Sequence, residues 1–502
     1  MNRSGLVTAR YAVATGVLGL ALLFIAPIVS SQSASCGLAT PAFCDNFNQG
    51  PAAARGRGGD LDSTKWSAAR LAPTDFSGFG PVANPVETAP VPPCKASLNA
   101  SSVYPNNDTL ICDASGTRSP QLMTAVVAQN YGNNSYLIRQ PFDFTNRTGK
   151  IVFDVDAATM GPLAGYIEID VTEDPSPAPT FQEYQNFEAG PVPRNGLMMK
   201  WLDTCGNPGG TSVTLNNTMV YTNYSAAIIS PTFTVWGADC VRTRQGALNH
   251  FEINVSRQHV DVYGSDYSTD NGQSYPNLRR IYSADLNLAF QRGYVHIAAR
   301  NHATKKYGYG DDWVFHWDNI GFDGPVIPAG RAYEIPDNNT AGNYSNYGNA
   351  AIMNLGYLLL DGTTGKPAGV YDPVNRLPAF QIQNVNISGA TGARLSLNVG
   401  FNTITHTADA SWGLSYRFNG GTWRNRQLTA GELTAINTAG SAGNVSMVID
   451  VPLADIRSGL NTLDFLPLNA PMDLAPVIAN IDLVIATNGA SAPAPPVNLR
   501  IQ

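Results

Sequence analysis

The sequence predicts an all-β fold, and three observations lead to this prediction. The chain of 502 residues contains 47 glycines and 34 prolines, and only 14% of it is charged, a composition typical of many short strands joined by turns. Short apolar runs alternate with clusters of Asn, Gly, Pro and Ser. In residues 150–156, Ile151, Phe153 and Val155 occupy every second position and therefore share one face of a strand.

The same alternation predicts further strands along the chain. Residues 250–255 and 259–263 predict a hairpin around Ser256, Arg257 and Gln258. In the second half, the apolar residues of the candidate strands are Ile352/Leu355/Leu358, Phe380/Ile382/Val385, Leu395/Leu397/Val399, Leu414/Tyr416/Phe418, Val445/Met447/Ile449/Val451 and Ile481/Leu483/Ile485.

Two local signals interrupt this series of strands. Asn419, Gly420 and Gly421 predict a tight hairpin turn, because asparagine and glycine accept the backbone conformation that such turns require. Thr429 and Glu432 have the spacing of a capping box, which predicts one short helix from Thr429 to Ile436.

The first 35 residues have the composition of a secretory signal peptide. Arg3 and Arg10 precede an apolar run, and the small residues Ser33, Ala34 and Ser35 follow it. The alternative is an uncleaved membrane anchor, since the apolar run is about as long as a bilayer-spanning helix. We therefore expect a secreted protein, with membrane attachment only through an uncleaved N-terminal segment.

All six cysteines follow that segment, and their even number in a secreted chain predicts disulfides. Of the connectivities that six cysteines allow, we expect pairing between sequence neighbours: Cys36–Cys44, Cys94–Cys112 and Cys205–Cys240. No cysteine lies beyond residue 240. The second half of the chain must therefore depend on its hydrophobic core.

These features divide the chain into four parts. We expect a signal peptide at residues 1–35, a β-sandwich at 36–327, a smaller C-terminal β-sandwich at 328–489 and a tail rich in Pro and Ala at 490–502. The boundary near 328 follows from the cysteine distribution and from the linker-like residues 325–330. The net charge of −7 and the absence of a basic patch argue against nucleic-acid binding.

Four segments of the first sandwich resemble the concanavalin A-like lectin/glucanase superfamily. They are the opening residues 45–48 (DNFN) and 61–66 (LDSTKW), the hairpin 251–263 (FEINVSRQHVDVY) and the closing residues 317–324 (WDNIGFDG). The resemblance covers residues 36–327 and implies a concanavalin A-like jelly-roll sandwich, followed here by the second, smaller β-sandwich. This fold is found in lectins, hydrolases and adhesion modules, so it leaves the activity open.

Residues 168–173 (EIDVTE) resemble the active-site strand of laminarinase-type glycoside hydrolases. The resemblance implies Glu168 as the nucleophile, Asp170 as the neighbour that modulates its pKa, and Glu173 as the acid/base. A retaining glycosidase holds its two carboxyls about 5–5.5 Å apart. Because residues five apart point to opposite faces of a regular strand, this mechanism requires a bulge at Val171 or Thr172.

Two features of the neighbouring sequence argue against hydrolysis. Glu173 is followed by prolines at 175, 177 and 179, which would end the strand beside the acid/base. Residues 160–164 lack the bulky aromatic platform that precedes this motif in the hydrolase family. A polar strand that contacts saccharide or simply faces solvent is therefore the alternative.

A second candidate site is rich in aromatic and amide side chains. Sugars are bound by aromatic rings against their C–H surfaces and by amides at their hydroxyls. The candidate residues between positions 301 and 313 are Asn301, His302, Tyr307, Tyr309 and Trp313. Trp313 has an alternative role as a core anchor of the last strand.

The concanavalin A-like resemblance also implies a structural calcium where the first and last strands meet. Asp45 and Asp318 are its candidate ligands, because calcium prefers carboxylate and carbonyl oxygens. The alternative is an ordinary turn or strand edge at Asp318.

We therefore expect a secreted, disulfide-bonded protein whose two β-sandwiches engage an extracellular polysaccharide. Lectin-like binding is placed ahead of retaining endo-hydrolysis of a β-glucan-like chain. A structural or adhesion protein is the third possibility. An enzyme would show the two glutamates converging in a cleft, whereas a binding protein would not.

Overall fold

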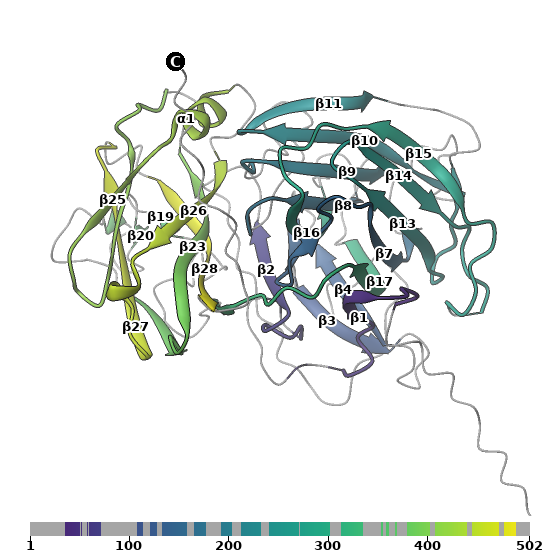
Figure 1. Cartoon of the computed structure of the whole chain (residues 1–502), viewed down its shortest axis with the longest axis horizontal. Coiled ribbons are helices and arrows are strands. Elements are labelled where there is room, and N and C mark those ends of the chain that lie inside the picture. Colours follow the sequence, from purple (N-terminus) through teal and green to yellow (C-terminus); the bar gives the residue numbers. More distant parts are fainter. Residues whose placement is uncertain are drawn as a thin grey trace, which may run out of the picture.

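The structure is a computed structural model. It describes residues 36–50, 52, 58, 60–71, 108–113, 121–127, 133–157, 165–176, 192–202, 212–231, 240–270, 272–301, 313–334, 353–354, 358–360, 367–368, 379–401, 407–438, 444–470 and 476–487. In this part of the chain, strands predominate and form two sandwiches that lie side by side (Figure 1). The predicted all-β fold, with a large sandwich followed by a smaller one, is confirmed. No helix of the described residues is long and apolar enough to cross a membrane.

The first sandwich consists of two large antiparallel sheets. The eight-stranded sheet has the order β15 (Arg279–Asp285), β14 (His259–Gly264), β13 (Asn249–Val255), β7 (Gly149–Val155), β17 (Trp313–Asp323), β4 (Gln121–Val127) and β3 (Asp108–Asp113), with β1 (Pro41–Asp45) paired to β17. The nine-stranded sheet has the order β11 (Ser225–Pro231), β10 (Ser212–Thr222), β9 (Gly196–Leu202), β8 (Gly165–Thr172), β16 (Arg292–Asn301), β5 (Asn133–Ile138) and β2 (Trp66–Leu71), with β12 (Val241–Arg242) on β10 and β6 (Phe142–Asp143) on β16.

The second sandwich consists of a five-stranded and a four-stranded sheet. The five-stranded sheet has the order β18 (Arg331–Glu334), β28 (Val477–Thr487), β23 (Ala390–Gly400) and β26 (Asn444–Val451), with β19 (Met353–Asn354) on β28. The four-stranded sheet has the order β22 (Phe380–Val385), β27 (Gly459–Leu468), β24 (Gly413–Phe418) and β25 (Arg424–Gln427). A small hairpin joins β20 (Leu358–Leu360) to β21 (Pro367–Ala368), and two short helices are α1 (Ala430–Asn437) and the 3₁₀ turn η4 (Leu453–Asp455).

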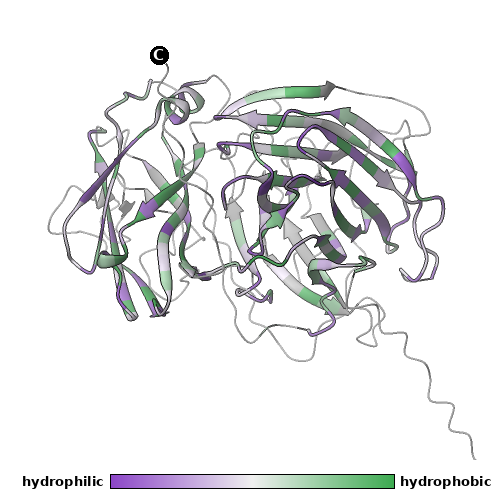
Figure 2. Cartoon of the chain, viewed as in Figure 1, coloured by the Kyte–Doolittle hydropathy of each residue, from purple (hydrophilic) through white to green (hydrophobic). Residues whose placement is uncertain are grey.

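Strand alternation explains how the first sandwich is held together. Along many strands the colour changes between hydrophobic and hydrophilic (Figure 2). In β8, Ile167, Ile169 and Val171 belong to the core between the two large sheets. The intervening residues of β8 point to the outer face of the nine-stranded sheet. The same rule therefore places Glu168 and Asp170 on that outer face.

The predicted turn and helix signals are also confirmed. Asn419 and Gly420 have positive φ angles of 54° and 68° between β24 and β25, as a tight hairpin requires. Thr429 accepts a hydrogen bond from the Glu432 backbone N–H, while the Glu432 side chain accepts one from the Thr429 backbone N–H. This capping box satisfies two backbone donors at the start of α1.

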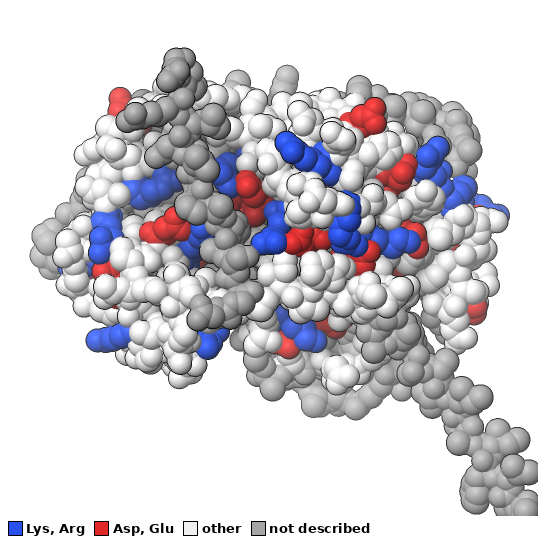
Figure 3. Space-filling model, in the orientation of Figure 1, with Lys and Arg blue, Asp and Glu red and all other residues white. Residues whose placement is uncertain are grey.

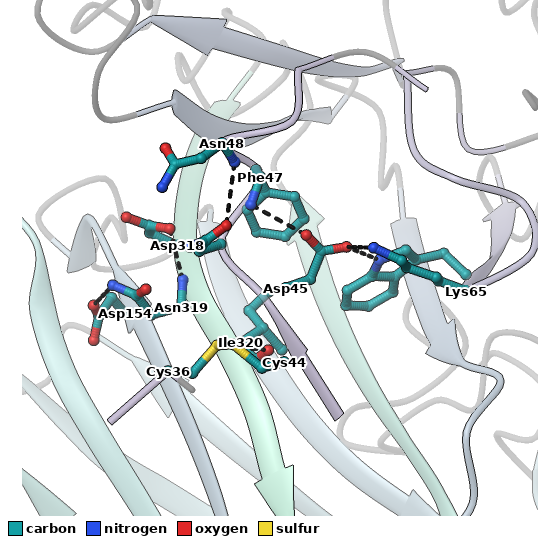
Figure 4. Close-up of a disulfide and its surroundings, with 12 residues drawn as sticks. Cys36, Cys44, Asp45, Phe47, Asn48, Lys65, Asp154, Asp318, Asn319 and Ile320 are labelled. Carbon is teal, nitrogen blue, oxygen red and sulfur yellow. Dashed lines mark hydrogen bonds and ion pairs between the residues drawn. A yellow bond between two sulfur atoms is a disulfide. The ribbon is translucent and has the colours of Figure 1, made fainter. Parts of the chain in front are cut away.

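Cys36 and Cys44 form a disulfide, as predicted, and this bond holds the start of the described chain beside β17 (Figure 4). Disulfides persist in oxidising compartments, so this bond indicates a non-cytoplasmic location. Cys112 and Cys240 are also disulfide-bonded. Cys94 and Cys205, their predicted partners, lie outside the described residues.

Peptide mapping without reduction is expected to recover Cys94 linked to Cys112 and Cys205 linked to Cys240. The reason is that a short separation along the chain favours pairing in a secreted protein with an even cysteine number. Mapping after reduction serves as the control, because every cross-linked peptide should then disappear. A peptide that joins Cys112 to Cys205 would show the predicted connectivity to be wrong.

Candidate functional site

Glu168 and Asp170 lie on the outer face of β8, and the pairing of this strand is regular. Residues Gly165 to Thr172 pair one to one with β16, and Ile167 to Thr172 pair one to one with β9. The expected bulge at Val171 or Thr172 is therefore not present. As a result, Glu168 and Asp170 share a face, whereas Glu173 follows the end of β8 and has the opposite position in the alternation.

Glu168 is held in a buried charge network. Its Oε2 atom lies 2.8 Å from Arg300 Nη2, and the two side chains are 0% and 6% exposed. Lys200 pairs with Glu168 across β8 and β9 and is also buried. The Lys200 ammonium lies 3.9 Å from the centre of the Tyr166 ring. A buried carboxylate bound to a buried arginine is a typical structural ion pair, because removal of either charge would leave the other uncompensated.

Asp170 has a different electrostatic environment. Burial raises its pKa well above the ordinary value, and the nearby charge of Glu168 raises it further, while Arg300 opposes this shift. Asp170 therefore keeps its proton to a higher pH than an exposed aspartate does.

The neighbouring His296, which pairs with Asp170, is neutral. Burial lowers the pKa of His296 to about 3. Thr172 Oγ1 donates to the Asp174 carbonyl oxygen at 2.6 Å and lies 2.8 Å from His296 Nε2. Because the threonine proton is already used, His296 Nε2 must carry the ring proton and donate to Thr172.

Glu173 binds a different set of residues from Glu168. Its Oε2 atom accepts hydrogen bonds from Arg194 Nη2 at 2.7 Å and from Asn195 Nδ2 at 2.6 Å. Arg194 also binds Asp174 at 2.8 Å. The predicted acid/base thus belongs to a half-buried ion-pair cluster after β8.

The second sandwich covers the outer face of the nine-stranded sheet, so this face is buried rather than open. Ser67 Oγ donates to Asp482 Oδ2 at 2.6 Å, and Arg139 binds both Asp482 at 3.2 Å and Glu334 at 3.0 Å. Residues of this face that are at most 6% exposed are Ser67, Ser135, Leu137, Tyr166, Glu168, Asp170, Thr172, Met198, Lys200, Met219, Tyr221, His296, Ala298 and Arg300.

The second candidate site is described only at its two ends. Asn301 is the last residue of β16 and pairs with Gly165 at the start of β8. Trp313 is the first residue of β17 and pairs with Val127. His302, Tyr307 and Tyr309 lie outside the described residues. Asn301 and Trp313 thus belong to different sheets, the nine-stranded and the eight-stranded sheet respectively.

Asp45 and Asp318, the predicted calcium ligands, accept hydrogen bonds from neighbouring groups of the chain. Asp45 Oδ1 accepts from the Phe47 backbone N–H at 3.1 Å, and Oδ2 accepts from Trp66 Nε1 at 3.0 Å and lies 3.8 Å from the Lys65 ammonium (Figure 4). Asp318 Oδ1 accepts from the Asn319 backbone N–H at 2.7 Å. A calcium ion at this place would have to share these carboxylate oxygens with the hydrogen-bond donors, so the calcium site stays a prediction. The described residues contain no group of three or more metal-ligating side chains.

A cluster that the sequence analysis did not identify lies on the outer face of the eight-stranded sheet. Asp154 is 1% exposed. It accepts hydrogen bonds from His250 Nδ1 at 2.6 Å, from the Tyr275 hydroxyl at 2.5 Å and from Asn319 Nδ2 at 2.7 Å. This cluster attaches the segment that follows β14 to the centre of the sheet. The spacing of Asp154, His250 and Tyr275 in the sequence gives no signal for it.

The stability of the first sandwich is expected to fall as the pH rises from about 6.5 to about 9. Burial alone would lower the pKa of His250, but hydrogen bonds to Asp154 and Glu252 outweigh burial and raise it to about 9. A raised histidine pKa stabilises the fold below the unfolded value, and this contribution disappears as the pH passes the folded value. Urea unfolding at several pH values in this range measures the free energy of unfolding. His250→Gln is the control, because its free energy of unfolding should change less with pH.

At acidic pH, Glu252 is expected to have the opposite effect, so that the stability of the first sandwich falls as the pH falls. Its hydrogen bond with His250 and its ion pair with Lys150, 2.7 Å away, lower its pKa from 4.5 to about 2, although burial opposes the shift. Its stabilising contribution is therefore present above pH 4.5 and is lost as the pH falls towards 2. If the urea midpoint of the unmodified protein stayed constant from acidic to alkaline pH, the roles given to His250 and Glu252 would both be wrong.

The charged network on β8 could be recognised only in part from sequence. His296, Ala298 and Arg300 alternate with apolar residues in β16, which marks a polar outer face. However, alternation does not identify which strand lies beside β8, and so does not pair Arg300 with Glu168. Figure 3 shows that acidic and basic side chains are interspersed over the visible face, without a large basic area.

The site and fold together define a class: a two-sandwich β protein whose acidic strand is buried under its own second module. No protein-family model and no curated protein matches the sequence. Solved structures that are similar to the chain include the VIP36 exoplasmic/lumenal domain in its Ca²⁺/Man3GlcNAc-bound form, with 12% identity, 42% of this chain and 83% of that chain covered and a TM-score of 0.25.

Two glucanases are similar over a longer part of the chain. A GH16 protein of the mixed linkage glucan PUL from Bacteroides ovatus, in complex with a G4G4G3G product, has 9% identity, covers 56% of this chain and 99% of its own, and gives a TM-score of 0.30. A β-1,3-1,4-glucanase (lichenase) from a mouse hindgut metagenome has 9% identity, with 56% and 98% covered and a TM-score of 0.26.

Proposed function

We propose that this protein is a secreted, lectin-like protein that binds an extracellular polysaccharide without hydrolysing it. The single observation that carries this choice is the buried ion pair between Glu168 and Arg300. A retaining glycosidase needs two carboxyls that face the same sugar from about 5–5.5 Å apart. Glu168 lies instead under the second sandwich, and Glu173 is bound to Arg194 and Asn195.

Secretion is supported by the apolar N-terminal segment and by the Cys36–Cys44 disulfide. The binding residues in this proposal are Asn301, His302, Tyr307, Tyr309 and Trp313, because they combine aromatic rings with amide and imidazole hydrogen-bonding groups. The proposal does not depend on a structural calcium ion at Asp45 and Asp318, which stays a prediction.

Retention on immobilised polysaccharides tests the proposal. The mature chain is expected to bind at least one member of a panel of neutral and acidic polysaccharides. The double variant Tyr307→Ala/Tyr309→Ala is expected to bind roughly tenfold more weakly, because each aromatic contact contributes about 0.5–1.5 kcal/mol. Tyr263→Ala is the matched control, since Tyr263 lies on β14, in the sheet that does not carry Glu168.

Release of reducing ends from the same panel tests the hydrolytic alternative. The unmodified protein, Glu168→Gln and Glu173→Gln are all expected to be inactive, because neither carboxyl is positioned to act on a sugar. Activity that both substitutions abolish would overturn the proposal in favour of a glycosidase. Absence of both binding and activity over the whole panel would favour a structural or adhesion role instead.

A further inference from the structure

We infer that the second sandwich is a displaceable cover, which separates from the outer face of the nine-stranded sheet and so controls the access of polysaccharide to that face. This inference rests on the proposed function for the nature of the ligand. The displacement itself rests on the contacts between the two sandwiches. Three features of these contacts carry it: their polar character, their division into two ends, and the single linker beside them.

The two sheet faces that meet are both polar. From the first sandwich come Glu168, Asp170, His296 and Arg300, together with Lys200. From the five-stranded sheet come the buried polar residues Ser396, Asn398, Ser446, Asn480 and Asp482. Interfaces that never open are usually as apolar as a domain core, whereas interfaces that form and separate are more polar. When the sandwiches separate, ionisable groups regain water, which lowers the free-energy cost of opening.

One end of the interface is charged. Arg139 donates from Nη1 to Asp482 Oδ2 at 3.2 Å and from Nη2 to Glu334 Oε1 at 3.0 Å. Ser67 donates to the same Asp482 oxygen at 2.6 Å. Arg139 and Ser67 belong to the first sandwich, while both carboxylates belong to β18 and β28 of the second. We call these contacts of Arg139 and Ser67 with Asp482 and Glu334 the latch. Replacing a carboxylate of the latch by an amide of the same size should weaken it.

The other end of the interface is apolar and lies at β26 and α1. Met198, Met219 and Tyr221 of the first sandwich belong to the same hydrophobic cluster as the core of the second. Val192 and Val445 form a parallel backbone bridge there. The Tyr224 hydroxyl donates to Glu432 Oε1 at 3.1 Å, and a Cβ on Gly431 would lie 2.8 Å from Tyr224 Cδ2.

A single described segment of chain, residues 324–330, passes from the first sandwich to the second. It leaves β17 after Asp323 and enters β18 at Arg331, and Val326 within it is 69% exposed. Gly324 and Gly330 have positive φ angles of 126° and 78°, which other residues rarely adopt. An exposed tether of this kind permits the second sandwich to move without unfolding of either core.

Distance measurement between spin labels tests the displacement directly. Ile228 on β11 and Leu460 on β27 are 57% and 44% exposed, and they lie in different sandwiches. In the protein with Ile228→Cys and Leu460→Cys, a single label pair reports the separation, because all described native cysteines are disulfide-bonded. The unmodified interface is expected to give one dominant short distance.

Weakening the latch is expected to produce a second, longer distance. Glu334→Gln/Asp482→Asn removes both charges that face Arg139, and loss of even one charge-assisted hydrogen bond shifts the ratio of separated to docked molecules about tenfold or more. Gly431→Val acts at the opposite end by crowding Tyr224, and should give the same longer distance. Asp464→Asn is the control, since Asp464 pairs at 2.8 Å with Arg417 inside the second sandwich.

Polysaccharide retention is measured on the same variants. The inference is supported if both interface variants show the longer distance and bind polysaccharide at least several-fold more tightly than the control. It is overturned if the distance stays short in both folded variants, or if separation leaves binding unchanged. Failure of the proposed function is distinguishable, because then neither the unmodified protein nor any variant would bind polysaccharide.

Discussion

Replacement of Arg300 by methionine is expected to lower the free energy of unfolding by about 3–5 kcal/mol, because it breaks a buried ion pair. The physical reason is that Glu168, at 0% exposure, would lose the cation 2.8 Å away, and Asp170 beside it would lose the charge that opposes its raised pKa. Urea unfolding followed by tryptophan fluorescence measures the loss, because Trp66, Trp201 and Trp317 are fully buried.

Two further variants separate the loss of a buried charge from the loss of any arginine. Arg300→Met/Glu168→Gln is expected to be more stable than Arg300→Met alone, since the uncompensated carboxylate becomes a neutral amide. Arg394→Met should cost at most about 1 kcal/mol, because its partner Asp450 is 65% exposed and solvent screens the pair. Equal losses for Arg300→Met and Arg394→Met would contradict the buried network.

Phe153→Ala is expected to destabilise the first sandwich by about 3–5 kcal/mol, since it leaves a cavity where four fully buried aromatic rings meet. The Phe153 ring centre lies 5.2 Å from that of Phe251, 5.7 Å from that of Trp201 and 5.9 Å from that of Trp317. These residues come from both large sheets, so the cluster holds the sheets together. Calorimetric melting measures the effect.

Phe153→Leu keeps most of the side-chain volume and should lose only about 1.5 kcal/mol. The melting profile of Phe153→Ala also reports on the second sandwich. If the two sandwiches unfold independently, the transition of the second should keep its temperature while that of the first falls. A stability loss no larger than that of Phe153→Leu would show that the core adapts to the cavity.

Local signals in the sequence predicted local structure well. The hairpin of β13 and β14, the turn at Asn419 and the capping box at Thr429 each depend on residues close together in the chain, and all three are confirmed. Strand β27 was not predicted, although Leu463 and Phe465 alternate within it, because Pro467 and neighbouring polar residues interrupt the pattern.

The arrangement of the site was less predictable for a physical reason. Alternation separates an apolar face from a polar one, but a polar face that meets another polar face has the same sequence pattern as one that meets water. Glu168 and Asp170 therefore predicted an accessible strand. The pairing of Arg139 with Asp482, 343 residues apart, could not be read from either segment alone.

The direction of β17 would decide how the first sandwich is oriented on a membrane. Its first residue, Trp313, ends the segment with the candidate binding residues, and its last, Asp323, pairs with Pro41 near the point where the chain enters the fold. Eleven residues of extended strand separate these ends by roughly 35 Å. If the N-terminal segment stays in a membrane, this orientation would point the Trp313 end of β17 away from the lipid surface and towards polymers in the surrounding medium.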